Sequence, residues 1–186
     1  MNIRLRKIKL EDKIELIEML NEYEKNEPLP GIYRYEGIRN FEKLKDLDFD
    51  LWLEEQIANE EDENLPEDFS PQTVYIAVNE RDNIIGMTTL RWKEVPALTK
   101  FGGYIGYNIR PSQRGKGYAK EILILALEKM WEQGRNRVLV CCKDFNIASK
   151  KTIESCGGKY DSTYFNGEDG YNHLRYWIYK DVLDEE

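Results

Sequence analysis

The feature that most constrains this chain is a strand that runs into a glycine-rich turn and then into an amphipathic helix. The segment reads IRPSQRGKGYA and spans residues 109–119. Pro111 ends the strand, because proline has no backbone N–H to donate to a ladder. The helix expected over 115–133 carries one apolar face, formed by Ala119, Ile122, Leu123, Ala126 and Met130. Such a helix packs on a sheet, which indicates a mixed α/β fold.

The turn has the chemistry of an anion cradle. A helix N-terminus presents unpaired N–H groups and about half a positive charge, so a diphosphate fits there. Gly115 and Gly117 let the backbone approach such a group closely, Arg114 and Lys116 add charge, and Ala119 keeps the first turn small. The alternative is a glycine-rich turn that only caps an ordinary helix, and the spacing alone leaves it open.

Other glycine motifs fit this segment badly. In a P-loop, Gly-Lys is followed by Ser or Thr, whereas Gly115-Lys116 is followed by Gly117. A dinucleotide fingerprint needs a third glycine where the chain has Lys120. A nucleotide-binding protein of either kind is therefore disfavoured.

Hydrophobic periodicity predicts one domain over residues 1–186, with a core over about 1–180. The expected element order is βααβββαβαββ, a mostly antiparallel sheet flanked by helices. Strands are predicted at 3–8, 73–79, 84–92, 104–109, 137–142, 160–165 and 174–179, and helices at 11–27, 41–60, 115–133 and 146–156.

Composition excludes several functions. A net charge of −8 argues against nucleic acid as a partner, because phosphate binding needs a basic face. The sequence has no apolar run of about 18 residues and no secretory signal, so we expect no membrane span. One histidine and no Cys-x-x-Cys spacing predict no metal site. The three cysteines, Cys141, Cys142 and Cys156, suggest reduced thiols in the cytoplasm.

One stretch carries charge of a single sign. Residues 54–68 hold eight acidic residues and no Lys or Arg. They form either a solvated helix end and loop or an acidic lip that attracts a cationic substrate.

The turn and a second segment together resemble the GNAT superfamily of N-acetyltransferases. The family's pyrophosphate signature, Gln/Arg-x-x-Gly-x-Gly/Ala, matches Arg114-Gly115-Lys116-Gly117-Tyr118-Ala119. The family also has an Asn that opens the next helix, and Asn146-Ile147-Ala148-Ser149 fits that place. The wider pattern is similar to a bacterial branch of predicted acetyltransferases and to the branch that acetylates ribosomal-protein N-termini.

The resemblance implies acetyl-CoA as cosubstrate and an amine as acceptor, either a small cationic amine or a peptide N-terminus, in a direct attack within a ternary complex. It implies that the strands at 104–109 and 137–142 splay apart and that the pantetheine arm bonds to the backbone near Tyr107–Ile109. Asn146 would bond the pantetheine chain. The diphosphate would be held by the backbone N–H groups of Arg114, Gly115, Lys116, Gly117, Tyr118 and Ala119. Many relatives are dimers, so a homodimer is left open.

The match fails at the usual catalytic side chains. The family's Tyr acid corresponds to Ile153, and we prefer Ser149, the serine of the ribosomal-type branch, as donor to the leaving thiolate. A capping serine is the alternative. The family's strand-four Glu corresponds to Tyr104, which holds a water or lines the acceptor pocket, and Tyr107 is the other strand candidate.

The base and the acceptor pocket are less constrained. His173 has a side chain suited to a base, but the sequence offers it no visible partner. The acceptor side of the family follows the first helix, so Tyr33, Tyr35 and Trp52 are the aromatic residues we expect there. Loss of both usual catalytic side chains motivates a second hypothesis, a catalytically weak regulatory module that binds acyl-CoA.

Overall fold

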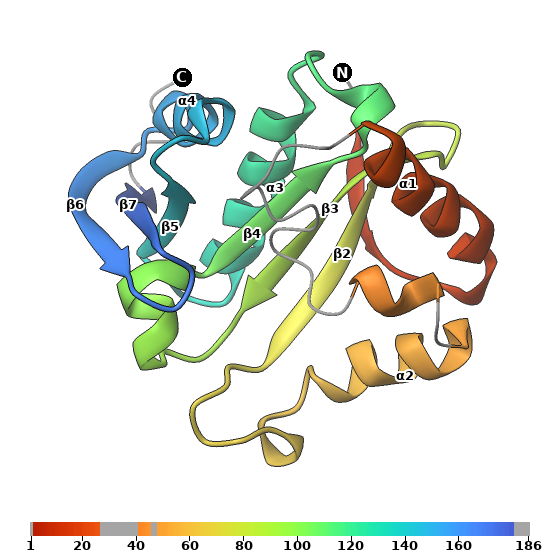
Figure 1. Cartoon of the computed structure of the whole chain (residues 1–186), viewed down its shortest axis with the longest axis horizontal. Coiled ribbons are helices and arrows are strands. Elements are labelled where there is room, and N and C mark those ends of the chain that lie inside the picture. Colours follow the sequence, from red (N-terminus) through yellow and green to blue (C-terminus); the bar gives the residue numbers. More distant parts are fainter. Residues whose placement is uncertain (1, 27–40, 46–47, 181–186) are drawn as a thin grey trace.

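The structure is a computed structural model that describes residues 2–26, 41–45 and 48–180. Its strands and helices follow the predicted order βααβββαβαββ, so the predicted fold class is confirmed (Figure 1). The elements are β1 (Arg4–Lys7), α1 (Lys13–Asn26), α2 (Phe49–Ala58), β2 (Gln72–Val78), β3 (Ile84–Arg91), β4 (Ile105–Ile109), α3 (Tyr118–Glu132), β5 (Arg137–Lys143), α4 (Ile147–Ser155), β6 (Lys159–Asn166) and β7 (Tyr171–Tyr179).

Several helix boundaries differ from the predictions, and the first helix, expected from residue 11, begins at Lys13 after a 3₁₀ turn at Leu10–Asp12. The helix expected over 41–60 is divided into a 3₁₀ turn at Phe41–Lys45 and α2, which starts after Asp48. Asp48 caps α2 because its side chain accepts from Asp50 N–H at 3.0 Å. The helix expected from residue 115 starts at Tyr118, because Gly117 has a left-handed φ of 84° that a helix interior does not allow.

The strands form two sheets with entirely antiparallel pairing. One sheet has the order β1-β2-β3-β4 and the other β5-β7-β6. Strands β4 and β5 are therefore neighbours that belong to different sheets (Figure 1). This arrangement leaves β4 as an edge strand that has no ladder partner on the side of β5 among the described residues.

The two sheets meet just before β4 begins. Tyr104 N–H donates to Leu139 O at 2.8 Å, which ties the chain at this point to the middle of β5. Gly103 has a φ of 66°, and a Cβ there would lie 3.0 Å from both Leu139 O and Cys141 N. Glycine thus permits the close approach of the chain to β5 at this point.

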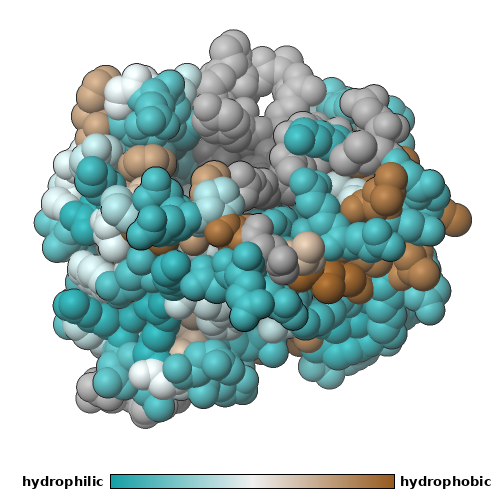
Figure 2. Space-filling model, turned by 90° about the horizontal axis from the view of Figure 1, so that it is seen from below, coloured by the Kyte–Doolittle hydropathy of each residue, from teal (hydrophilic) through white to brown (hydrophobic). Residues whose placement is uncertain are grey.

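Each face of the larger sheet carries its own apolar core. One core joins α3 and the second sheet to β4, and the other joins α1 and α2 to β2 and β3. The face of the molecule seen in Figure 2 is mainly hydrophilic, with a hydrophobic area on the side where α2 lies. The large apolar side chains exposed on α2 and near the start of α1 are Leu10, Ile14, Leu51 and Ile57.

Within the described parts of the chain, no helix has both the length and the apolar character that a membrane crossing needs.

Candidate functional site

The turn between β4 and α3 presents backbone N–H groups to solvent. Gly115 and Gly117 have φ values of 74° and 84°, so both adopt the left-handed conformation that glycine tolerates best. Lys120 N–H bonds back to Gly117 O at 3.1 Å. The N–H groups from Gly115 to Ala119 have no backbone acceptor among the described residues. The helix N-terminus can therefore bind an anion.

Two cations border this turn. Lys116 Nζ donates to Ser112 O at 3.1 Å and to Gln113 Oε1 at 3.0 Å. The guanidinium of Arg114 lies 5.4 Å from the ring centroid of Tyr23, and its Nε donates to Ile109 O at 3.3 Å. Both side chains are exposed, so their charges add to the positive potential of the helix end.

The free edge of β4 continues from the turn. Thr88 Oγ1 donates to Gly106 O at 2.8 Å and Arg110 N–H donates to Ile85 O at 2.9 Å, so the even-numbered residues bond towards β3. The N–H and C=O groups of Tyr107 and the N–H of Ile109 consequently point away from β3, whereas the C=O of Ile109 already accepts from Tyr23 Oη at 2.9 Å. This edge can pair with an extended ligand that carries amides.

A hydroxyl pair connects β4 and α4. Tyr107 Oη and Ser149 Oγ lie 2.9 Å apart, at hydrogen-bond distance. Asn146 is the N-cap of α4, and its Oδ1 accepts from Ser149 N–H at 3.1 Å. Two of the predicted catalytic residues and one predicted cofactor residue thus come together.

The buried environment of Tyr107 favours the protonated form of its phenol. Burial raises the pKa of the Tyr107 phenol above its ordinary value, although the hydrogen bond to Ser149 acts in the opposite direction. The phenol keeps its proton near neutral pH and can donate a hydrogen bond to Ser149 Oγ. Ile153, at the position of the family's usual acid, is fully buried and apolar.

Tyr104 is not brought to this pair. Its side chain is 1% exposed, and the guanidinium of Arg135 lies 4.4 Å from its ring centroid. Burial raises the pKa of Tyr104 to about 12, and Glu94 adds to the effect. Arg135 follows the C-terminal end of α3, whereas the anion-binding turn precedes its N-terminal end. A phenol in this position is a poor base.

The predicted acceptor aromatics divide into two groups. Trp52 is fully buried and packs against Phe41 and Phe49, with centroids 6.2 and 5.8 Å away. It belongs to the core under α1 and α2 and does not line an open pocket. Tyr33 and Tyr35 lie outside the described residues.

His173 has a partner that the sequence pattern did not reveal. Its Nε2 lies 2.9 Å from Asp169 Oδ2, and Lys143 Nζ lies 3.5 Å from the same oxygen. His173 is buried beside Phe101, whose ring centroid is 5.5 Å away. The spacing of four residues across the β6–β7 turn was the only signal in the sequence.

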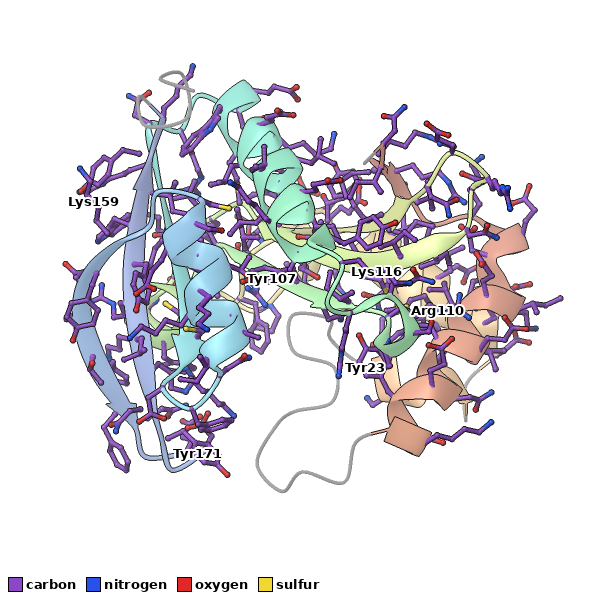
Figure 3. All side chains as sticks on the ribbon, turned by 90° about the horizontal axis from the view of Figure 1, so that it is seen from above. Tyr23, Tyr107, Arg110, Lys116, Lys159 and Tyr171 are labelled. Atoms are coloured by element: carbon purple, nitrogen blue, oxygen red, sulfur yellow. The ribbon has the colours of Figure 1, made fainter. Side chains whose placement is uncertain are left out.

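Sequence reasoning also missed the contacts of α1 with the turn. Glu22 and Tyr23 of α1 bond to Arg110, Ser112 and Ile109. Figure 3 shows Tyr23 and Arg110 near each other between α1 and the turn that carries Lys116. The signal available was the recurrence of Glu15, Glu18 and Glu22 on one face of α1.

Among the described residues, no group of three or more His, Cys, Asp or Glu side chains is arranged to hold a metal ion.

The fold has many solved counterparts. Mycobacterium smegmatis RimJ, solved in complex with CoA-disulfide, has a TM-score of 0.71 at 16% identity and covers 99% of this chain and 85% of its own. A ribosomal-protein-S5-alanine acetyltransferase from Vibrio fischeri has a TM-score of 0.68 at 16% identity, with 97% and 94% covered. The spermidine N-acetyltransferase of Vibrio cholerae, in complex with CoA and spermine, has a TM-score of 0.63 at 17% identity, and the match covers 96% of each chain.

At these identities the solved structures establish the fold alone. A search of curated protein sequences finds no significant match to this chain. The model of the acetyltransferase (GNAT) domain family matches residues 2–159, which is most of the chain. The chain therefore belongs to the GNAT family of acetyltransferases.

Proposed function

We propose that this protein transfers an acetyl group from acetyl-CoA to an amine. The observation that carries the proposal is the free edge of β4, which connects the anion-binding turn at one end to the Tyr107–Ser149 pair. Acetyl-CoA consists of a diphosphate, then a chain with amides, then a thioester. The anion-binding turn, the edge of β4 and the Tyr107–Ser149 pair would contact these three parts in that order.

The residues present fit this cosubstrate. The backbone N–H groups from Gly115 to Ala119 would hold the diphosphate, because they have no backbone acceptor among the described residues, whereas the N–H of Arg114 already donates to Pro111 O at 3.3 Å. The N–H and C=O of Tyr107 and the N–H of Ile109 would bond the pantetheine arm, and the amide of Asn146 would bond it from α4. Acetyl-CoA supplies the activated acetyl thioester.

Ser149 would donate a proton to the leaving sulfur. Its hydroxyl oxygen can accept a hydrogen bond from Tyr107, whose raised pKa keeps the phenol protonated, and this leaves the Ser149 proton free to point to the sulfur. A backbone N–H at the end of β4, near Ile109, would stabilise negative charge that develops on the acetyl oxygen. These roles need only neutral hydroxyl and amide donors, which suits a half-buried site.

The acceptor we favour is a cationic small amine or a peptide N-terminus. The net charge of −8 and the acidic residues 54–68 support a cationic acceptor. Two of those carboxylates already form ion pairs, Glu60 with Lys7 and Asp62 with Lys93. The acceptor amine has to lose a proton before it attacks, because an alkyl ammonium has a pKa of about 10.4.

The acceptor class is tested by an amine panel. Purified protein is incubated with acetyl-CoA and polyamines, peptides with free or blocked N-termini, and neutral and anionic amines, while the release of CoA thiol is followed. We expect turnover with cationic acceptors. Turnover confined to neutral or anionic acceptors would contradict the proposed charge preference.

A second function, acyl-CoA binding without efficient transfer, is favoured by one observation. Ile153 is fully buried where the family usually has its Tyr acid, and Tyr104 is buried with a raised pKa where many relatives have Glu. A single-turnover experiment separates the two functions. Tight acetyl-CoA binding with no transfer to any amine would favour the regulatory module.

A further inference from the structure

The last turns of α1 contact the turn between β4 and α3 at several points. Tyr23 and Glu22 are adjacent in α1, and the segment that they contact runs from Ile109 to Arg114. This segment leads directly into the glycines of the anion-binding turn. The contacts join residues about 90 positions apart in the sequence, since Glu22 and Arg110 are separated by 88 positions.

Tyr23 fixes the end of β4. Its side chain is fully buried, and its hydroxyl donates to Ile109 O at 2.9 Å. Arg114 Nε donates to the same carbonyl at 3.3 Å, with its guanidinium over the Tyr23 ring. One tyrosine therefore orients the last carbonyl of β4 and the first residue of the glycine signature.

Glu22 fixes the residues between these two points. Its Oε1 accepts from Arg110 Nε at 2.6 Å, and its Oε2 accepts from Ser112 N–H at 3.0 Å. Burial acts to raise the pKa of Glu22, but the bonds from Ser112 and Arg110 outweigh it and hold the pKa below the ordinary value. Glu22 therefore stays ionised near neutral pH and keeps both bonds.

A carboxylate beside an anion site is unfavourable when charge alone is considered. Like charges at this range weaken the binding of a diphosphate. Both oxygens of Glu22, however, bond to the turn that precedes the cradle, and Arg110 offsets its charge. The contacts restrict the turn before a ligand arrives, so less conformational freedom is lost on binding.

We infer that Glu22 and Tyr23 are positioning residues that hold the β4–α3 turn in the conformation that binds the diphosphate of acetyl-CoA. This inference rests on the proposed function. Neither residue has to touch the ligand; each acts through Ile109, Arg110 or Ser112.

The experiment is calorimetric titration of CoA into three variants, at low and at high salt. Tyr23→Phe removes one hydroxyl and no charge, and Glu22→Gln removes the carboxylate with almost no change of shape. Glu18→Gln is the matched control, because Glu18 lies on the same helix, is 59% exposed and reaches Arg110 only at 3.5 Å. Loss of one or two hydrogen bonds predicts Kd values raised about fivefold to tenfold in the first two variants. The control should bind like the wild type.

The sign of the Glu22→Gln effect is decisive. A role through charge alone predicts tighter binding of CoA, most of all at low salt, because a negative group has been removed. The positioning role predicts weaker binding at both salt concentrations. In turnover, the KM for acetyl-CoA should rise while the KM for the acceptor stays unchanged, a split that a general loss of stability would not produce.

Binding of CoA by Glu22→Gln and Tyr23→Phe with wild-type affinity, or tighter, would overturn the inference. If either variant fails to fold, Arg110→Lys removes the bond from Nε to Glu22 and keeps the positive charge, and it should weaken CoA binding in the same way. Failure of the proposed function is distinguishable, because the wild type itself would then not bind CoA.

Discussion

Tyr107 on β4 and Ser149 on α4 share a hydrogen bond 2.9 Å long that links the strand of one sheet to the helix after β5. The residues are 42 positions apart, and they belong to different elements, the strand β4 and the helix α4. Ser149 also closes the cap of α4 through its N–H, so its backbone position is fixed by Asn146. The hydroxyl pair is thus held from both sides.

Replacement of Ser149 tests the proposed proton donor. Ser149→Ala should lower kcat at least tenfold, because general acid catalysis contributes about 10²–10⁴-fold. The KM for acetyl-CoA should change little. Steady-state kinetics with a turned-over amine measure both constants. Ser155→Ala is the control, since Ser155 lies on α4 and its hydroxyl bonds only locally, to Thr152 O at 2.8 Å. An unaltered kcat in Ser149→Ala would remove the assigned role.

Tyr107→Phe tests whether the two hydroxyls act together. The ring and its packing remain, and only the donor to Ser149 is lost. We expect kcat to fall, and we expect the double variant to be little slower than Ser149→Ala, because groups that act as a unit are not additive. A double variant whose defect equals the product of the two single defects would show independent roles.

The raised pKa of Tyr107 predicts the shape of the pH profile. A phenol whose pKa in the folded protein lies above the ordinary value stays protonated at every pH up to the ordinary value. The wild-type kcat should therefore show no loss from Tyr107 as the pH rises to about 10, the ordinary tyrosine pKa. A fall in kcat between pH 8 and 10 that disappears in Tyr107→Phe would contradict this assignment.

The glycine turn can be tested with a matched pair of glycines. Gly117 at the start of α3 and Gly134 beyond its end have φ values of 84° and 82°. Valine should strain the backbone at both sites by about 1–2 kcal/mol. Gly117→Val should also abolish or strongly weaken CoA binding, while Gly134→Val should bind CoA normally. Thermal unfolding measures the strain, and calorimetry measures the affinity. Equal CoA affinities in the two variants would place the diphosphate elsewhere.

Asp169 gives a prediction for stability at acid pH. Burial acts to raise its pKa, but bonds from Tyr171 N–H and His173 outweigh this, so the pKa lies below the ordinary value of 3.8. A depressed folded pKa stabilises the protein above the unfolded pKa, and this contribution is lost as the pH falls through the folded value. Asp169→Asn should therefore lower the unfolding temperature at pH 7, and the difference from wild type should shrink below about pH 4. A difference independent of pH would contradict the electrostatic account.

The order of elements followed from local patterns, and this is why it could be predicted. Alternation over residues 73–79, the apolar face of α3 and the glycines that end α4 each depend on neighbours in sequence. The separation of β4 from β5 came from the resemblance to the family, since no local pattern distinguishes a splayed strand from a paired one.

The positions of individual side chains were harder to predict. Trp52 was expected beside the acceptor, yet it fills the core with Phe41 and Phe49, because an aromatic residue on a helix serves either role. The Glu22–Arg110 and His173–Asp169 pairs depend on the way distant or turned segments meet. Sequence spacing contains little information about such contacts.

The most direct test of the account is calorimetric titration of the wild-type protein with acetyl-CoA, with CoA, ATP and NAD as comparisons. The account predicts that acetyl-CoA and CoA bind with a Kd in the micromolar range or below, and that ATP and NAD do not. An absence of binding to acetyl-CoA would mean that the turn from Arg114 to Ala119 only caps α3, and the proposed transfer reaction would fall with it.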